Sequence, residues 1–204
     1  VDRPLPGSDL KIIKMSDEPL HDWSWVADWS VSEVGDIVVR GGVVTTAYYN
    51  NVTENGLAKI KDHDTFWHRI GDLGYLDAEN RLWFCGRKAH RVETADGVML
   101  TIPCEAIFNV HPGVYRSALV GVTGNGEKII PVMIVEPACR CDQQQLLAEL
   151  RKLAKASELT SKIEHFLIND EFPVDIRHNA KIFREKLAVW AEKRLRADSC
   201  EDGL

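Results

Sequence analysis

The sequence predicts an α+β protein in two parts, a β-rich part over residues 1–86 and a mixed part over residues 91–204. Two patterns support this fold class. Apolar and polar residues alternate through residues 67–87 on both sides of the turn-forming residues 77–80, which is typical of a β-hairpin. From Asp142 onward leucines recur at helical spacing, which indicates an amphipathic helix. Strand and helix patterns are both present, and the helical ones concentrate in the second part.

The composition is that of an ordinary globular protein, with 204 residues, 45% hydrophobic and 27% charged. This is enough chain for one large domain or two small ones, and the patterns favour two. A formal net charge of -6 without a dominant run of Lys or Arg argues against nucleic acid as a partner. No stretch approaches the roughly 20 apolar residues of a transmembrane segment. The beginning also lacks a signal-peptide profile, so we expect a cytoplasmic protein.

Cysteines and histidines do not form a recognisable metal or redox motif. The 5 cysteines are an odd count, and the spacing of Cys139 and Cys141 fits neither a zinc knuckle nor a redox pair. His68, His90 and His111 are not at metal-ligand spacing. We therefore expect free thiols and no metal site built by the protein itself.

The first part reads as strands joined by loops and one short helix. Residues 15–32, rich in tryptophan, are expected to form a loop with packed aromatic side chains. A helix capped by Thr53 is expected to place Leu57 and Ile60 on its apolar face. The expected strands are residues 10–14, residues 33–41 and the two arms of the hairpin.

The second part alternates strands and helices. A hairpin with an Asp96-Gly97 turn opens it, and a helix with Pro103 in its first turn follows. The link at residues 123–128 superficially suggests a phosphate-binding loop, but it lacks the Walker spacing, so a plain turn is favoured. The expected core strands are residues 115–122, 129–136 and 163–168, and the expected later helices begin at Asp142 and span residues 182–195.

Two Gly-containing pairs in the first hairpin are candidate ligand-binding residues. Asp72 follows a glycine on one arm, and Arg87 follows a glycine on the other. A carboxylate can accept two hydrogen bonds from a vicinal diol, and an arginine on the paired strand can donate to the same sugar or to a phosphate. Each residue alone has a plainer reading, a carboxylate bonded to backbone and an arginine in an ordinary ion pair. Together they suggest a clamp for the ribose of a nucleotide.

With the segment at residues 173–181, these motifs resemble the adenylate-forming (AMP-forming) ligases, the superfamily of acyl-CoA synthetases, luciferases and peptide-synthetase adenylation domains. The resemblance implies that residues 1–86 form the barrel-like β subdomain that ends a large adenylation domain. Lys88, Ala89 and His90 would lie in a hinge at residues 87–90. Residues 91–204 would be a small mobile domain with a three-stranded sheet and flanking helices.

The resemblance also implies roles for individual residues. Asp72 and Arg87 would bind ATP or AMP, and Mg²⁺ would arrive with the ATP. Lys181, expected at the start of a helix, would be the catalytic lysine that bridges the substrate carboxylate and the α-phosphate. Without the resemblance, Lys181 would be read as a solvated surface lysine. Gly97 and Glu105 are candidates for the site of a second half-reaction.

Several positions depart from the family pattern. Ile70 replaces the usual Thr, Ala89 stands where many members carry a hinge Asp or Lys, and residues 93–97 differ from the CoA-using pattern. The sequences of residues 86–95, 102–112 and 174–182 most resemble one branch of the family, the β-lactone synthetases of long-chain olefin biosynthesis. That branch implies activation of a long-chain 3-hydroxy fatty acid whose own hydroxyl displaces AMP, so the use of CoA is left open.

Two other functions stay open, a fatty acyl-CoA ligase and a non-catalytic interaction module on the same fold. The motifs match only the last part of the family's enzymes. We therefore expect a C-terminal fragment that is inactive alone, with the rest of its own adenylation domain and pathway enzymes as partners.

Overall fold

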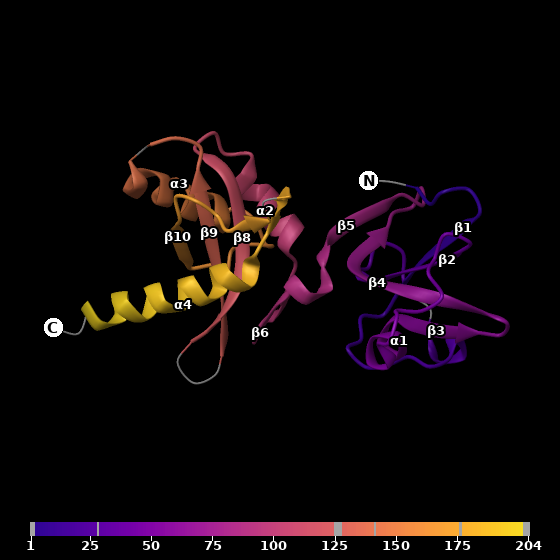
Figure 1. Cartoon of the computed structure of the whole chain (residues 1–204). Helices are drawn as coiled ribbons and strands as arrows, with labels where there is room; N and C mark the ends of the chain where they lie inside the picture. Colours follow the sequence, from indigo (N-terminus) through magenta and orange to yellow (C-terminus); the bar gives the residue numbers. More distant parts are fainter. Residues whose placement is uncertain (1–2, 28, 125–127, 141, 176, 202–204) are drawn as a thin grey trace. The chain divides into compact units, whose positions relative to one another are not determined.

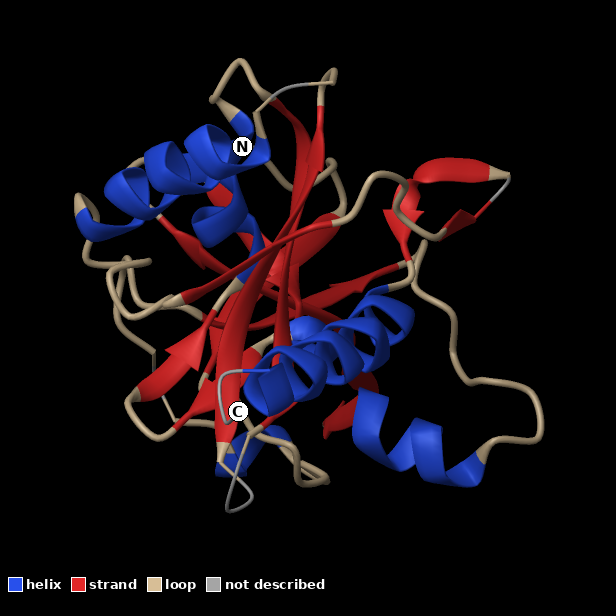
Figure 2. Ribbon diagram, turned by 90° about the vertical axis from the view of Figure 1, so that its left-hand side faces the viewer, coloured by secondary structure: helices blue, strands red, loops and turns tan. Residues whose placement is uncertain are grey.

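The computed structural model describes residues 3–27, 29–124, 128–140, 142–175 and 177–201, and the chain divides into two compact units (Figure 1). Unit 1 comprises Val1–Ala89 and unit 2 comprises His90–Leu204. Strands predominate in unit 1, and the longer helices lie in unit 2 (Figure 1). Figure 2 shows the strands and helices of the whole chain by colour. The α+β class predicted from the sequence is confirmed.

Unit 1 is built on a five-stranded antiparallel sheet in the order β1-β2-β4-β3, with β5 also paired to β4. The 12-residue strand β4 is long enough to pair with β3 through its first half and with β5 through its second half. Asn80 turns the chain between β4 and β5 with φ +56°, a left-handed conformation that asparagine tolerates better than most residues. The predicted hairpin is therefore confirmed. The strands are β1 Ser8–Ile13, β2 Gly35–Gly41, β3 Lys59–Asp62, β4 Thr65–Leu76 and β5 Leu82–Arg87.

Two details of unit 1 differ from the sequence prediction. The short helix α1 spans Val52–Ala58, and its cap is Asn51, whose side chain accepts a hydrogen bond from the Glu54 amide. Thr53 is therefore inside the helix. Ile60 lies in β3, where it is fully buried, because pairing with β4 offers it a deeper core than the helix face would.

The tryptophan-rich connection contributes to the core of unit 1. It contains the single turn η1 Trp23–Trp25, capped by Asp22. Trp23 stacks on Trp67 with 4.6 Å between ring centroids, and the buried Ile60 lies in the same cluster. Packing of aromatic side chains from this loop agrees with the prediction for residues 15–32.

Unit 2 contains the predicted three-stranded sheet, in the order β10-β9-β8. Strands β8 and β9 form an antiparallel hairpin, and β10 runs parallel to β9 after the chain has crossed over through α3. Asp142 caps α3 by accepting hydrogen bonds from Gln144 and Gln145, so the helix begins where the sequence predicted. The elements are α2 Thr101–Asn109, β8 Val114–Thr123, β9 Ile129–Pro137, α3 Gln143–Lys155, β10 His165–Ile168 and α4 Arg184–Glu201.

The sheet of unit 2 separates two apolar clusters. Alternate residues of β8 point to opposite faces, so Leu119 packs in one cluster while Ala118 packs in the other. The first cluster also takes buried residues of α2 and α3, such as Phe108 and Leu150. The second takes those of α4, such as Leu187. Helices therefore cover both faces of this sheet.

Two short ribbons complete unit 2. Strands β6 Val92–Thr94 and β7 Gly97–Met99 form the predicted hairpin, with Gly97 at φ +127°. Strands β11 Val174–Asp175 and β12 His178–Ile182 form a second ribbon just before α4.

Lys181 lies in β12, so its predicted position at the start of a helix is wrong. The register of the ribbon pairs Val174 with Ile182, which keeps the backbone extended to that point. The amide of Phe183 then donates to the carbonyl of Pro173 at 2.8 Å. The last helix accordingly starts two residues later than predicted, at Arg184.

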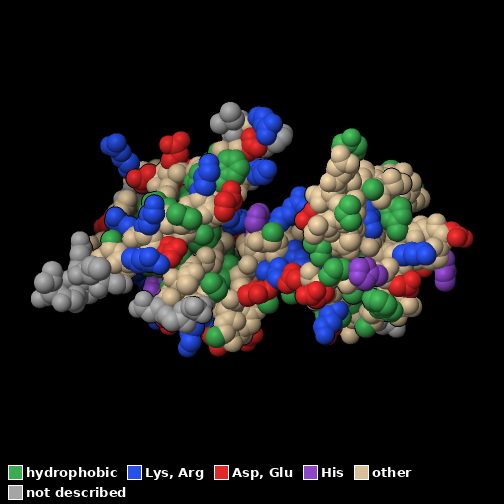
Figure 3. Space-filling model, turned by 60° about the horizontal axis from the view of Figure 1, so that its bottom comes forward, with side chains coloured by type: hydrophobic (Ala, Val, Ile, Leu, Met, Phe, Trp, Pro, Cys, Tyr) green, Lys and Arg blue, Asp and Glu red, His purple; other side chains and the backbone are tan. Residues whose placement is uncertain are grey.

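Among the residues described, no helix is long and apolar enough to span a membrane. Acidic and basic side chains are interspersed over the surface of both units in the view of Figure 3, without one sign dominating. This distribution agrees with the low formal charge of the whole chain.

Candidate functional site

The hairpin of unit 1 brings Asp72 and Arg87 together. They are register partners on β4 and β5, and Arg87 Nη1 lies 2.9 Å from Asp72 Oδ1. The arginine side chain is 58% exposed while the aspartate side chain is 20% exposed. Arg87 Nη1 also donates to the carbonyl of Ile70 at 3.3 Å. The pair therefore has a largely buried acidic end and an accessible basic end.

The carboxylate of Asp72 is incompletely satisfied. Its Oδ1 atom is buried and, within the described part of the chain, has the ion-pair contact with Arg87 but no hydrogen bond. Burial raises the pKa of Asp72 above its ordinary value, although the charge of Arg87 opposes this. A buried carboxylate oxygen with spare accepting capacity is suited to a donor such as a sugar hydroxyl.

Unit 1 contains a buried cluster of charged side chains, one of which, Lys88, is close to the boundary of the two units in the sequence. Asp36 is 2% exposed, and its Oδ2 atom lies 2.7 Å from Arg69 Nη2 and 3.1 Å from Lys88 Nζ. Lys88 and Arg69 both donate to the carbonyl of Ser16 as well. Through Ser16 and Asp36, Lys88 is held to two separate segments of unit 1. Local sequence reasoning missed it, and its one signal was an aspartate beside the apolar run of β2.

The predicted hinge residues straddle the unit boundary. Lys88, Ala89 and His90 form one turn of 3-10 helix, η2, and the boundary falls between Ala89 and His90. Lys88 is largely buried in the charge cluster, whereas Ala89 is exposed.

Lys181 is exposed on the β11-β12 ribbon of unit 2. Hydrogen bonds from Arg177, and more weakly the charge of Lys181, lower the pKa of Asp175 below its ordinary value. The lysine therefore lies within electrostatic reach of a carboxylate at the turn of its own ribbon. The neighbouring side chains of residues 178–180, which include the candidate helix-capping or phosphate-orienting residues His178 and Asn179, lie outside the described side chains.

Gly97 and Glu105 have different surroundings, the first exposed and the second buried. Gly97 is exposed at the start of β7, where its carbonyl accepts a hydrogen bond from Thr94 Oγ1 at 2.9 Å. Glu105 is 4% exposed on α2 and is bound through both oxygens by Arg184. Burial raises the pKa of Glu105, and the charge of Arg184 opposes the rise. The assignment of Gly97 and Glu105 to a second half-reaction stays a prediction.

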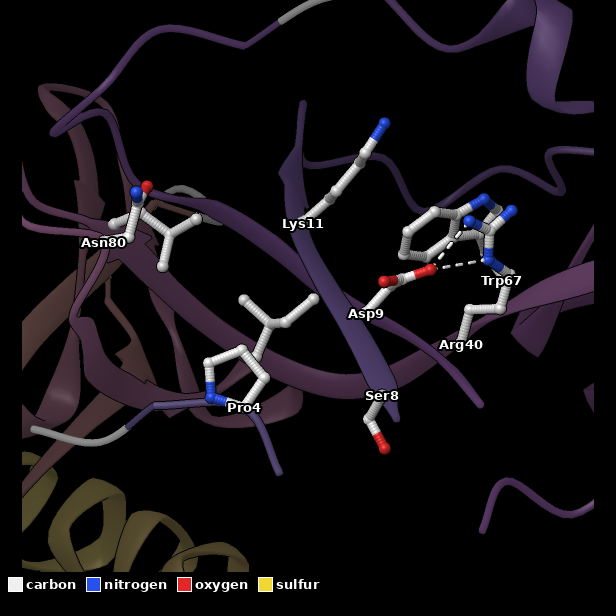
Figure 4. Close-up of a pocket in the computed structure, with 9 residues that line it drawn as sticks. Pro4, Ser8, Asp9, Lys11, Arg40, Trp67 and Asn80 are labelled. Atoms are coloured by element: carbon white, nitrogen blue, oxygen red, sulfur yellow. Dashed lines mark hydrogen bonds and ion pairs between the residues drawn. The ribbon is translucent and has the colours of Figure 1, made fainter. Parts of the chain in front are cut away.

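Unit 1 also carries a shallow pocket of about 380 Å³ beside the edge strand β1 (Figure 4). In the figure, Arg40 turns toward Asp9, to which it is ion-paired at 2.7 Å, and lies next to Trp67. Lys11 extends away from this pair. Neither Asp72 nor Arg87 lines this pocket.

No group of three or more His, Cys, Asp or Glu side chains arranged to hold a metal ion occurs in the described ranges. Of the cysteines placed there, Cys85 and Cys104 are buried free thiols and Cys139 is an exposed one.

Comparisons with known proteins identify the class of protein to which this chain belongs. The chain belongs to the adenylate-forming (AMP-forming) ligases. It is similar to the olefin β-lactone synthetase of Stenotrophomonas maltophilia, with 46% identity over 194 residues, 92% of this chain and 35% of that protein. The olefin β-lactone synthetase of Xanthomonas campestris is 45% identical over 195 residues, with the same shares covered. No protein-family model matches the chain.

A more distant protein is also similar in sequence, and solved structures are similar in fold. The sulfoacetate–CoA ligase of Cupriavidus necator is 34% identical over 129 residues, 60% of this chain and 24% of that protein. The fold matches the o-succinylbenzoate–CoA synthetase of Bacillus subtilis, solved with ATP and magnesium, with a TM-score of 0.70 and 22% identity over 91% of this chain and 34% of that one. The chain thus spans about a third of the length of the two β-lactone synthetases.

Proposed function

We propose that this chain is the C-terminal part of an ATP-dependent enzyme that activates a 3-hydroxy fatty acid as its acyl-adenylate and then closes it to a β-lactone. The chain covers 35% of the length of its β-lactone synthetase relatives, so the remaining adenylation domain would hold the rest of the active site. This chain alone would turn over little or nothing.

The observation that carries the proposal is the state of the Asp72 carboxylate. Its buried Oδ1 lacks a well-aligned hydrogen bond among the described residues, next to an arginine that remains 58% exposed. A ribose diol would donate to this carboxylate, and Arg87 would donate to the sugar or to a phosphate. Asp72 and Arg87 would thus hold the nucleotide from the hairpin of unit 1.

Lys181 would supply the positive charge for the chemical step. The substrate carboxylate attacks the α-phosphorus of ATP, a new O–P bond forms, and pyrophosphate leaves with the bonding electron pair. Negative charge spreads over the phosphoryl oxygens in the transition state, so a fixed ammonium group stabilises it. The exposure of Lys181 on its ribbon supports a role in which it reaches a ligand outside unit 2.

The lactone step would use a nucleophile already present in the substrate. The 3-hydroxyl oxygen attacks the acyl carbon, the acyl–phosphate bond breaks, and AMP leaves with the electron pair while the hydroxyl proton passes to solvent or to a base. Because the nucleophile is in the same molecule, it needs no binding site of its own. The departures of residues 93–97 from the CoA-using pattern support this reading.

We also propose that Lys88, Ala89 and His90 act as the hinge between residues 1–86 and a mobile domain of residues 91–204. The anchoring of Lys88 by Asp36 would hold the last residues of unit 1 still. The exposed Ala89, which follows it, would then be the first residue free to change its backbone angles.

An acyl-CoA ligase is the second candidate. It is favoured by the CoA-ligase relatives, of which the sulfoacetate–CoA ligase is one. In that case Gly97 would belong to the site of the second half-reaction and CoA would be a substrate. The free thiols of Cys85, Cys104 and Cys139 suit a reducing cytoplasm under either candidate, with pathway enzymes as further partners.

The test is a product analysis on the complete enzyme, with this chain joined to its adenylation domain. It would be incubated with ATP, Mg²⁺ and a long-chain 3-hydroxy fatty acid, with and without CoA, and the products identified by mass. We expect AMP and a product lighter than the acid by one water, independent of CoA. A thioester formed only with CoA would establish the second candidate. If no acid-dependent product forms, the remaining reading is a non-catalytic module.

A matched pair of variants would test the site. Lys181→Ala should lower the rate of acid-dependent pyrophosphate release by about 10² or more, because one strong electrostatic interaction is lost. Lys162→Ala, which removes another exposed lysine of unit 2, should leave the rate unchanged. Equal rates for both variants would contradict the role of Lys181.

A further inference from the structure

The ribbon that carries Lys181 is anchored at both ends by buried carboxylates. At its beginning, the amide of Phe172 donates to Glu136 Oε2 at 2.9 Å, and Arg116 Nε lies 2.7 Å from the same oxygen. At its end, Arg184 follows Lys181 by three residues and is bound by Glu105. The hydrogen bond from Phe183 to Pro173 ties the two ends to each other.

The Glu105 anchor is the more elaborate of the two. Arg184 donates through Nη1 to Oε1 and through Nη2 to Oε2 at 2.9 Å, so both oxygens are engaged by a single guanidinium. The Leu119 amide donates to Oε1 at 2.8 Å. The side chains of Glu105 and Arg184 are 5% and 13% exposed. One buried ion pair therefore joins α2, β8 and the first residue of α4.

Burying two charges costs free energy, so stability alone does not explain this ion pair. A buried ion pair can often be replaced by apolar side chains of similar volume without loss of stability, because taking two charges out of water offsets their attraction. What the bidentate geometry adds is direction, since a planar guanidinium bound through two nitrogens fixes both distance and orientation. The orientation fixed here is that of the backbone three residues after Lys181.

We propose that Glu105 and Arg184 are positioning residues for Lys181. The pair fixes the junction of β12 and α4 against the sheet of unit 2, so that the ammonium group of Lys181 projects from a rigid ribbon. A catalytic group that is misplaced by about 1 Å can lose about 10²-fold in rate. The inference rests on the proposed function, because it assigns to the pair the placement of the lysine proposed to act on ATP.

The test uses the complete enzyme and separates the two chemical steps. Step one is pyrophosphate release at saturating ATP, and step two is product formation from supplied acyl-adenylate, which needs no new phosphoryl bond. Glu105→Gln should lower the rate of step one by about 10²-fold, with the KM for ATP and the rate of step two nearly unchanged. Glu149→Gln, an exposed ion-paired carboxylate of the same unit, is the control and should change neither.

A double-variant comparison distinguishes positioning from general damage. In a Lys181→Ala background, Glu105→Gln should cause no further loss in step one, because there is no lysine left to misplace. Equal losses in both steps, or a further loss in the Lys181→Ala background, would overturn the inference. If Lys181→Ala itself leaves step one unchanged, the proposed function of the site fails first.

A double variant that lacks the ion pair serves as the control for folding. The double substitution Glu105→Gln with Arg184→Met should retain the native circular dichroism spectrum, because both charges leave together and the glutamine oxygen can still accept from the Leu119 amide. It should still lose step one selectively, because the directional contact is gone. A folded double variant with the wild-type rate of step one would overturn the inference even if Glu105→Gln does not fold.

Discussion

Asp72 and Arg87 face each other across the β4-β5 pair, with 2.9 Å between Arg87 Nη1 and Asp72 Oδ1. The register of the hairpin brings them together, because residues opposite each other on paired strands are neighbours. Asp72 Oδ1 is buried and the arginine is exposed, so the pair presents one shielded and one accessible charge. Three predictions concern this hairpin, and a fourth concerns a buried thiol of unit 2.

Replacing Asp72 should weaken nucleotide binding. Asp72→Asn removes the charged acceptor, and a hydrogen bond to a charged group contributes about 1.5–3 kcal/mol, so the KM for ATP in the complete enzyme should rise by about 10- to 100-fold. Glu79→Gln, in the exposed turn of the same hairpin, is the control and should leave the KM unchanged. An unaltered KM for a folded Asp72→Asn enzyme would contradict the ribose-binding role.

The ionisation of Asp72 should be visible in the pH dependence of stability. Burial raises its pKa in the folded state, so the folded chain holds this proton more tightly than the unfolded chain does. Above the folded-state pKa, the ionisation of Asp72 therefore lowers the free energy of unfolding. This effect fades as the pH falls toward the ordinary aspartate pKa of about 3.9. Titration of the carboxyl carbon by NMR should give a pKa above that value. Asp72→Asn should remove the corresponding fall in stability with rising pH.

The turn residue Asn80 should contribute to the stability of unit 1. Its φ of +56° is unfavourable for a residue with an ordinary side chain, so Asn80→Ala should destabilise unit 1 by about 1 kcal/mol. Asn80→Gly should be nearly neutral. Urea unfolding followed by tryptophan fluorescence would measure this, because every tryptophan except Trp190 lies in unit 1. Equal loss in both variants would point to the asparagine side chain instead.

The buried thiol of Cys104 should resist alkylation. Burial and, next, the charge of Glu105 raise its pKa to about 11, so about one thiol in a thousand is ionised at pH 8. Cys139 is exposed and should react with iodoacetamide before Cys104 does. Peptide mapping by mass spectrometry at several times would follow both residues, with urea-unfolded protein as the control. Equally fast labelling of both in the folded chain would show that Cys104 is accessible.

Much of the fold follows from local patterns. The alternation on both sides of residues 77–80 specifies one register for the hairpin, since a shift by one residue would exchange its two faces. The spacing of leucines after Asp142 and the side-chain cap of that aspartate specify α3. The exact pairing of Asp72 with Arg87 does not follow from the turn, because a register shift between Leu73 and Gly74 moves Arg87 opposite Asp72.

Other features depend on contacts between residues far apart in the chain. Lys181 lies in a strand because Ile182 pairs with Val174, and no sequence periodicity around the lysine predicts that pairing. Glu105 and Arg184 are 79 residues apart, and Lys88 reaches Asp36 across 52 residues. A charged residue is compatible with a solvated surface until the fold buries it beside its partner. Local spacing therefore specified most of the strands and helices, but not the β11-β12 ribbon. The positions of the buried ion pairs required the packed chain, because desolvation and pairing of charge are properties of the assembled core.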